Sequence, residues 1–284
     1  MIPAAFDYAR ARSLADALKA AGTRGTKVIC GGQSLIPLLR FRLAQPKRLV
    51  DIGHLKELRG IARANGTIRI GAATTYRELL DSKLLAKQVP LIADVTTHIG
   101  DLQVRNVGTI GGGLAHADPA ADMPAVMLAL GATMVLRSTR GKRVVAARDF
   151  FRGPFETAMK SGELLIEIHV PVTAKGTGAA YASFDQAASG YPLVGAAAVV
   201  SRAKGKITSS SLAFTGLADT PFLSAAATAL VGTTGSADVV ERVAASAAPG
   251  VIANADIHAS AEYRLHLATV AARRALLEAI RRSA

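Results

Sequence analysis

The sequence has a single cysteine, Cys30, and no tryptophan among its 284 residues. One cysteine excludes an internal disulfide, and it excludes a metal cluster held by cysteines of this chain alone. No apolar run reaches the roughly 18 residues that a membrane-spanning helix needs. A basic-then-apolar signal sequence and a twin-arginine signal are also missing, so we expect a cytoplasmic protein without a membrane span.

Several well-known catalytic motifs are absent as well. The sequence contains no Walker A motif and no G-x-G-x-x-G fingerprint, which removes the main support for an NTPase or an ordinary Rossmann dehydrogenase. Its six histidines show no H-E-x-x-H spacing, and the segment around Ser34 lacks the second glycine of a nucleophile elbow. We therefore expect Ser34 to cap a helix.

The net charge of +13 permits two interpretations, a nucleic-acid surface or a basic protein that binds an anionic cofactor or an acidic partner. Aromatic residues make up only 5% of the chain and the basic residues are dispersed, so we favour the second. Four arginines do gather at the end of a predicted helix over 261–282, at positions 273, 274, 281 and 282. We interpret them first as a solvated face and second as a docking patch.

Two glycine-rich segments carry the clearest chemical signal. The first, CGGQSL at 30–35, lies between a predicted strand over 27–30 and a predicted helix over 35–43. The second, TIGGG at 109–113, precedes a run that ends in Asp118 and Asp122. Glycine allows φ > 0 and leaves backbone N–H groups open to a ligand, and a helix N-terminus favours a phosphate. Two such segments predict an extended diphosphate gripped from both sides, as in a dinucleotide cofactor.

The polar residues after the second segment have more than one interpretation. Carboxylates would repel a pyrophosphate, so Asp118 and Asp122 are better placed to accept hydrogen bonds from sugar or ribityl hydroxyls. The structural alternatives are a turn for Asp118 and the N-cap of a helix over 123–130 for Asp122. His116 and Asp118 could in principle hold a metal, but two ligands in one loop make a poor site. We expect His116 to hydrogen-bond a neighbour or the ligand, and we expect no metal.

Hydrophobic periodicity predicts the remaining elements. We expect the unit from 27 to 52 to be a parallel strand–helix–strand arrangement, and a polar boundary at 173–178. The other predicted helices are 3–21 (with Ser13 as N-cap of its second half), 75–80, 90–99, 223–231, 237–246 and 261–282. The other predicted strands are 48–52, 67–72, 132–137, 144–147, 164–170, 179–185, 194–202 and 207–215.

Three segments resemble a known family. They are CGGQSLIPLLRFRLAQPKRLVDI (30–52), QVRNVGTIGGGLAHADPAADMPAVMLALGA (103–132) and DIHASAEYRLHLATVAARRAL (256–276). They closely resemble the FAD-binding medium subunit of molybdenum hydroxylases, of the carbon monoxide dehydrogenase medium chain type, related to the flavin segment of xanthine dehydrogenase. The resemblance implies an α+β fold. A vanillyl-alcohol-oxidase-like FAD-binding domain would span 1–175, with subdomains at about 1–58 and 59–175, and a smaller α/β C-terminal domain would span 176–284.

The resemblance also implies where FAD is bound. It places the pyrophosphate at the first glycine segment, pyrophosphate and ribityl atoms at the second, and Tyr191 of ASGYPLVG (188–195) beside the isoalloxazine ring. A packed surface tyrosine is the alternative for Tyr191. The residues expected to contact FAD are Ile29, Cys30, Gly31, Gly32, Gln33, Ser34, Leu35, Ile99, Thr109, Ile110, Gly111, Gly112, Gly113, His116, Asp118, Asp122, Leu165 and Tyr191; none is expected to be catalytic.

The chain departs from the family pattern at two places. Gly113 stands where many relatives carry Asn or Ser, so a side-chain hydrogen bond to FAD is expected to be missing. Asp185 and Gln186 stand where a basic residue is expected, which changes the charge near the flavin edge.

The function implied is that of an FAD-binding electron-transfer subunit in a heteromeric molybdenum hydroxylase. A large subunit would oxidise the substrate at a molybdopterin centre, and a small subunit would pass electrons through [2Fe–2S] clusters to this FAD and on to an external acceptor. The absence of cysteines for clusters agrees with this division of labour. The alternatives are a stand-alone FAD-dependent oxidoreductase with its own small-molecule substrate beside Tyr191, and a non-catalytic nucleotide-binding module.

Overall fold

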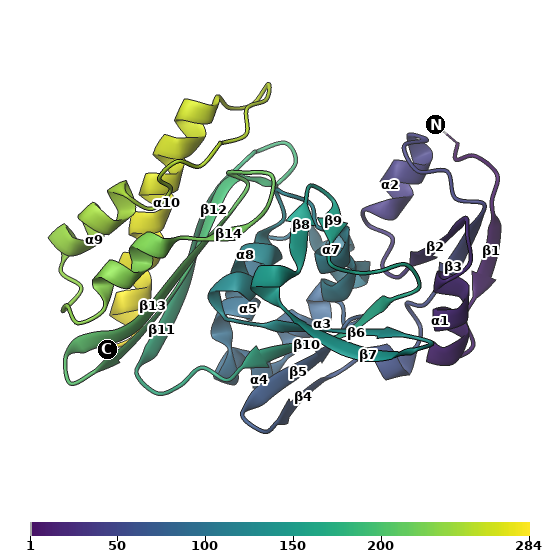
Figure 1. Cartoon of the computed structure of the whole chain (residues 1–284), viewed down its shortest axis with the longest axis horizontal. Coiled ribbons are helices and arrows are strands. Elements are labelled where there is room, and N and C mark those ends of the chain that lie inside the picture. The colour runs from purple at the N-terminus through teal and green to yellow at the C-terminus, as the bar shows by residue number, and fades with distance from the viewer. Residues whose placement is uncertain (1) are drawn as a thin grey trace.

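The computed structural model describes residues 2–284, and its three larger sheets are arranged in a row along the long axis of the molecule (Figure 1), with a fourth, two-stranded sheet beside them. The N-terminal sheet lies at one end, a five-stranded sheet with most of the short helices lies in the middle, and a four-stranded sheet covered by the last helices lies at the other end (Figure 1). Mixed helix and sheet in separate blocks confirm the α+β class.

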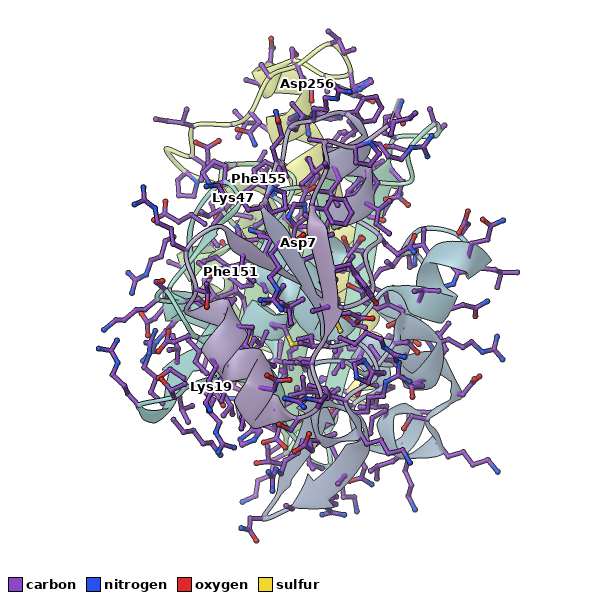
Figure 2. The ribbon with its side chains drawn as sticks, turned by 90° about the vertical axis from the view of Figure 1, so that its right-hand side faces the viewer. Asp7, Lys19, Lys47, Phe151, Phe155 and Asp256 are labelled. Carbon is purple, nitrogen blue, oxygen red and sulfur yellow. The ribbon has the colours of Figure 1, made fainter. Side chains whose placement is uncertain are left out.

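The N-terminal sheet is parallel, with strand order β1-β3-β2. Its elements are β1 (Asp7–Arg10), α1 (Leu14–Ala21), β2 (Thr26–Ile29), α2 (Leu35–Arg40) and β3 (Arg48–Asp51). The predicted parallel unit is confirmed. Figure 2 shows this domain from outside, with Asp7 on the sheet and Lys19 on α1.

The predicted helix over 3–21 is wrong in its first half. Asp7–Arg10 pairs with β3, and the Asp7 amide donates to the Lys47 carbonyl at 3.0 Å. Ser13 has an extended backbone and accepts a hydrogen bond from the Asp16 amide, so the helix begins only after it. The free edge of β3 thus decides the conformation of a segment whose own pattern is weak.

The central sheet is antiparallel, with order β4-β5-β10-β6-β7, and short helices cover it. Its strands are β4 (Ile61–Ala64), β5 (Thr67–Gly71), β6 (Thr133–Ser138), β7 (Gly141–Ala146) and β10 (Leu164–Pro171). Its helices are α3 (Tyr76–Asp81), α4 (Lys83–Gln88), α5 (Pro90–Thr96), α6 (Leu102–Val107), α7 (Ile110–His116) and α8 (Asp122–Ala129). Shorter elements are η1 (Lys56–Leu58), η2 (Ala147–Asp149), β8 (Phe151–Gly153) and β9 (Glu156–Thr157).

The C-terminal domain is an antiparallel meander followed by helices, and it contains the strands predicted over 179–185, 194–202 and 207–215. Its elements are β11 (Thr177–Asp185), β12 (Pro192–Ala203), β13 (Lys206–Thr215), β14 (Phe222–Leu223), η3 (Ala225–Leu230), α9 (Ala237–Ala245) and α10 (Ala261–Arg282). The predicted helix over 223–231 is instead a short strand and a 3-10 helix. The helix over 261–282 is confirmed residue for residue, and Ser260 caps it.

Helix α8 joins the central and C-terminal domains. All of its residues are buried, from Asp122 to Ala129, and it packs against β12 and β13. A helix that is apolar on every side is buried between two layers, and here those layers are the central domain and the C-terminal sheet. Residues Ala179, Ala197 and Ala213 of that sheet belong to the same hydrophobic cluster as α8. The two domains therefore share this cluster, while the other face of the C-terminal sheet forms a second cluster with α9 and α10.

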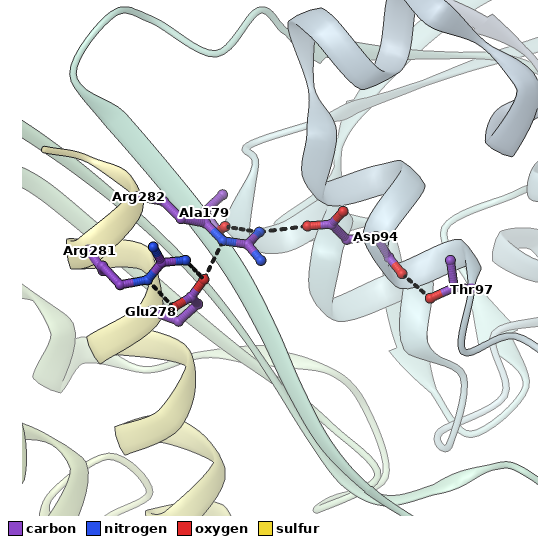
Figure 3. Close-up of polar contacts among 6 residues, drawn as sticks. All are labelled: Asp94, Thr97, Ala179, Glu278, Arg281 and Arg282. Atoms are coloured by element: carbon purple, nitrogen blue, oxygen red, sulfur yellow. Dashed lines mark hydrogen bonds and ion pairs between the residues drawn. The ribbon is translucent and has the colours of Figure 1, made fainter.

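The arginines at the end of α10 are tied to neighbouring residues. Arg282 pairs with Asp94 of α5 at 2.6 Å, donates to the Ala179 carbonyl and pairs with Glu278, which also pairs with Arg281 (Figure 3). Arg273 pairs with Glu241. All four arginines are exposed, as the prediction of a solvated face requires, and the Arg282 guanidinium in addition links α10 to the central domain.

Within residues 2–284, no helix is both long enough and apolar enough to cross a membrane.

Candidate functional site

The first glycine segment leaves β2 and turns sharply into α2. Gly32 has φ +74°, a conformation that side chains disfavour. Within residues 2–284, the backbone N–H groups of Gly32, Gln33 and Ser34 find no hydrogen-bond acceptor. Ser34 is not the side-chain cap predicted for it, since its hydroxyl makes no cap hydrogen bond. These free donors form a backbone surface suited to an anion.

The two glycine segments meet in space, as the sequence predicted for a ligand held from both sides. A Cβ at Gly31 would lie 2.4 Å from the Val107 carbonyl oxygen and 2.8 Å from the Gly108 Cα, directly before Thr109. Burial raises the pKa of the Cys30 thiol, and a hydrogen bond with Thr109 opposes that effect. Glycine at 31 is therefore required for the close approach of the segments.

The second segment differs from the expected open loop, because its glycines form the first turn of α7. Thr109 has an extended backbone and caps the helix, with its hydroxyl accepting from the Gly112 amide at 3.2 Å. The Gly111 amide donates to the Ala72 carbonyl and the Gly113 amide to the Thr109 carbonyl. The prediction that these N–H groups are open to a ligand is wrong, because the cap and the β5–α3 connection already accept from them.

The three glycines have different surroundings. A Cβ at Gly111 would lie 2.4 Å from the Ala72 Cβ, and one at Gly113 would lie 2.3 Å from the Tyr76 hydroxyl oxygen. Gly112 is exposed, and a Cβ there would contact only the Thr109 hydroxyl, at 2.8 Å. Gly111 and Gly113 are thus explained by packing, whereas Gly112 presents bare backbone to the surface.

Asp122 is buried, with 6% of its surface exposed, and it is the first residue of α8. The predicted N-cap role is wrong, because Ala121 occupies that position and no side chain caps the helix. The Tyr181 hydroxyl of β11 donates to its carboxylate at 2.7 Å. Burial raises the pKa of Asp122 to about 6, while the Tyr181 hydrogen bond opposes the shift. A buried carboxylate with one protein donor has capacity left for a hydroxyl ligand.

Asp118 and His116 have local partners. The Asp118 carboxylate accepts from the Ala120 amide at 2.9 Å, which confirms the turn role. The His116 ring lies 5.0 Å from the Phe155 ring, and burial lowers its pKa. Across residues 2–284 no three His, Cys, Asp or Glu side chains gather as metal ligands would.

Tyr191 is brought to the same region from the C-terminal domain. It closes the turn after β11, where its carbonyl accepts from the Gln186 amide, and 44% of its surface is exposed. Burial raises its pKa, and the charges of Asp118 and Asp122 add to that shift, which places all three near one another. Asp185, at the end of β11, raises the pKa of Asp122 further.

The remaining predicted contacts are apolar. Leu165 is buried in the central core opposite Leu136 of β6, and Ile99 is half-buried against the same core. Their contact with FAD stays a prediction.

Sequence reasoning missed two tyrosines, Tyr76 and Tyr181. Thr75 and Glu78 form a capping box, which marks the start of α3. A capping box does not indicate that Tyr76, the residue after Thr75, extends to α7. Tyr181 lies in a predicted strand, and only the packing of that strand on α8 brings it to Asp122.

The residues present fit a dinucleotide. The first segment supplies free amide donors for phosphate, Gly112 supplies bare backbone, and Asp122 supplies an acceptor for ribityl or sugar hydroxyls.

Comparison with known proteins agrees with a dinucleotide-binding site. The FAD binding domain in molybdopterin dehydrogenase matches residues 4–173, and the CO dehydrogenase flavoprotein C-terminal domain matches residues 179–279. The carbon monoxide dehydrogenase medium chain of Afipia carboxidovorans is 39% identical over 279 residues, which is 97% of each chain. The glyceraldehyde dehydrogenase medium chain of Sulfolobus acidocaldarius is 38% identical over 280 residues, which is 98% of this chain and 99% of the relative.

Solved structures show the same architecture over the full length. A chain of Cu,Mo-CO dehydrogenase in its cyanide-inactivated form matches with a TM-score of 0.96 and 39% identity, over 99% of this chain and 100% of that chain. A chain of the Hydrogenophaga pseudoflava carbon monoxide dehydrogenase that lacks the Mo-pyranopterin moiety matches with a TM-score of 0.97 and 36% identity, over 100% of both.

Fold and site together define an FAD-binding flavoprotein with a C-terminal flavoprotein domain. The chain belongs to the family of FAD-binding medium subunits of molybdenum hydroxylases, and its enzymatic class is that of an oxidoreductase subunit.

Proposed function

We propose that this chain is the electron-transfer subunit of a heteromeric molybdenum hydroxylase. Electrons released at a molybdopterin centre on a large subunit would arrive through [2Fe–2S] clusters of a small subunit and leave to an external acceptor. Support comes from relatives named as medium chains and from a solved relative named Cu,Mo-CO dehydrogenase. The observation that carries the proposal is the meeting of the two glycine segments, with Gly31 against Gly108.

Each part of the site has its own proposed role in holding FAD. Gly32 to Ser34 would hold the pyrophosphate through backbone amides, Gly112 would allow close approach, Asp122 would accept from a ribityl hydroxyl, and Tyr191 would shield the ring system. Bound FAD would supply the conversion between one-electron and two-electron transfer. Residues 1–175 would form the FAD-binding unit and 176–284 the C-terminal unit, and the cytoplasmic location stays a prediction.

The test is purification of a tagged chain from its native cells, followed by measurement of FAD, iron and molybdenum. We expect FAD with the chain, and iron and molybdenum with two co-purifying subunits. If the chain instead turns over a small reductant alone, with no partner present, the stand-alone oxidoreductase is correct. A chain that binds no FAD would overturn both alternatives and favour another nucleotide ligand.

A further inference from the structure

Tyr76, the first residue of α3, lies along the second glycine segment. Its amide donates to the Gly108 carbonyl at 3.0 Å, and the preceding Thr75 forms a β-bridge with Thr109. A Cβ at Gly108 would lie 3.3 Å from the Tyr76 ring. The ring is therefore fixed against Gly108 at one end, and its hydroxyl reaches Gly113 at the other.

The Tyr76 side chain is buried but its hydroxyl has no partner. Only 7% of the residue is exposed, and within residues 2–284 no group forms a hydrogen bond with the hydroxyl oxygen. Among the side-chain nitrogen and oxygen atoms of residues 2–284, those fully buried without a partner are His54 Nδ1, Arg105 Nε, Ser210 Oγ and Arg264 Nε. The Tyr76 oxygen is not among them, so it stays accessible beside Gly113. An unpaired hydroxyl on an otherwise buried side chain is unfavourable unless a ligand or water completes it.

Gly113 is what makes room for this hydroxyl. A Cβ at that position would lie 2.3 Å from the hydroxyl oxygen but 3.6 Å from the ring carbon that carries it. The clash is therefore with the oxygen alone, and a phenylalanine at 76 would leave space for a side chain at 113. Position 113 can hold a side chain or the Tyr76 hydroxyl, but not both without movement.

We propose that the Tyr76 hydroxyl is a cofactor-binding group, which donates a hydrogen bond to an acceptor oxygen of FAD where glycine at 113 leaves no side chain to do so. This inference rests on the proposed placement of FAD at the second glycine segment. Burial raises the pKa of Tyr76, and the charges of Asp122 and Tyr191 add to the shift, so the hydroxyl keeps its proton at neutral pH and acts as a donor.

The test is titration of FAD into the full apo chain, followed by flavin fluorescence, with Tyr76→Phe compared to wild type. Loss of one neutral hydrogen bond is expected to weaken FAD binding roughly three- to tenfold. Tyr263→Phe is the matched control, because that tyrosine is 50% exposed on α10, and its FAD affinity should equal that of wild type. The melting temperature of apo Tyr76→Phe should stay close to that of the wild-type apo chain, because the ring is retained.

A second pair of variants separates a binding role from a structural one. Gly113→Ser alone should weaken FAD binding, because its Cβ displaces the Tyr76 hydroxyl. In the Tyr76→Phe background the clash is gone, so Gly113→Ser should restore a hydroxyl and recover at least part of the lost affinity. A purely structural role for Tyr76 predicts no such recovery.

The outcomes are distinguishable. If wild type binds FAD and Tyr76→Phe binds it equally well, the inference is overturned while the proposed function stands. If Tyr76→Phe is weak and Gly113→Ser makes it weaker still, the hydroxyl is not the binding group. If the wild-type chain itself takes up no FAD, the proposed function fails and this inference fails with it.

Discussion

Gly112 is the residue of the glycine triplet that packing does not explain. Its neighbours Gly111 and Gly113 are hemmed in by Ala72 and Tyr76, whereas Gly112 is exposed and faces only the Thr109 hydroxyl. A residue that is small without a packing reason indicates close approach by something outside the chain.

We predict that Gly112→Val abolishes FAD binding or weakens it by roughly tenfold or more, because two methyl groups would occupy the face on which the cofactor is proposed to lie. Gly112→Ala is the control: it makes the same contact with Thr109 but adds no further atoms. FAD content per purified chain, measured after reconstitution, checks the prediction. Unchanged flavin content in the valine variant would show that this turn is not part of the cradle.

Asp122 is a buried carboxylate, and its burial makes ionisation unfavourable. Its pKa of about 6 in the folded chain lies above the ordinary 3.8, so between these values the folded state binds more protons than the unfolded state. The free energy of unfolding therefore falls as pH rises from about 4 to about 6 and stays at the lower level above that range. A carboxylate whose pKa is raised this far by burial is consistent with the ligand role proposed for Asp122.

We predict that Asp122→Asn makes the apo chain more stable at neutral pH, by about 1–3 kcal/mol, and that this advantage disappears near pH 4. Asparagine still accepts from the Tyr181 hydroxyl but carries no charge. Urea unfolding at both pH values measures the difference, with the exposed Asp219→Asn as control. The same substitution should weaken FAD binding. A stability gain that is equal at both pH values would contradict the ionisation argument.

At the level of single residues, the sequence predicted which segments come together at the proposed site but not the contacts that each residue makes there. Gly31 to Ser34 and Gly112 could be found because glycine patterns report backbone geometry. Tyr76 and Tyr181 could not, because each reaches the site across a contact between elements distant in the chain, Tyr76 to Gly113 and Tyr181 to Asp122. The capping role expected for Asp122 was wrong by one position, since Ala121 begins the helix.

Helix α10 carries two arginines whose environments differ sharply. Arg264, near its start, is 4% exposed and donates to the carbonyls of Leu193 and Gly216 and to the Asp256 carboxylate. The side chain of Arg282, at the end of the helix, is 39% exposed in its pair with Asp94, against 5% for the side chain of Arg264 (Figure 3). The sequence pattern singled out the second arginine and overlooked the first.

We predict that Arg264→Met lowers the free energy of unfolding by about 2–4 kcal/mol, because it leaves the buried Gly216 carbonyl and the part-buried Leu193 carbonyl without their donor. Arg282→Met should cost less than about 1 kcal/mol, since half-exposed ion pairs are weak. The two variants are matched controls for each other, made on one helix with the same replacement. If chemical denaturation shows that both variants lose the same free energy of unfolding, the inference that Arg264 holds α10 against the strands more strongly than Arg282 does is contradicted.

Elements with strong local signals were predictable and elements held by their neighbours were not. Helix α10 begins at the Ser260 cap and ends as its apolar stripe predicts, whereas β1 is a strand only because β3 offers it an edge. The order of the strands in the central sheet likewise depends on neighbouring elements rather than on local signals. β10 inserts between β5 and β6, and no periodicity within Leu164–Pro171 specifies those partners.

At the scale of the whole molecule, the shared core between the central and C-terminal domains governs how the chain unfolds. Helix α8 is buried on all sides, and separation of the domains would expose it together with the facing alanines of β11 to β13. Separation would also leave Asp122 without its Tyr181 donor. Each Å² of apolar surface that becomes exposed costs about 25 cal/mol. Neither domain is therefore expected to stay folded without the other.

We therefore predict a single cooperative unfolding transition for the central and C-terminal domains. In calorimetry they should give one endotherm, and FAD should shift it upward as a ligand of the folded state does. A double substitution on α8, Val126→Ala with Met127→Ala, should lower the melting temperature of that one transition without splitting it, because both side chains are buried at the shared core. The C-terminal unit also has a hydrophobic cluster of its own, between its sheet and η3, α9 and α10, so the boundary proposed at 175 and 176 predicts two separable transitions if that cluster alone keeps the unit folded. Two resolved endotherms, one of them insensitive to the α8 substitutions, would show that the domains fold independently.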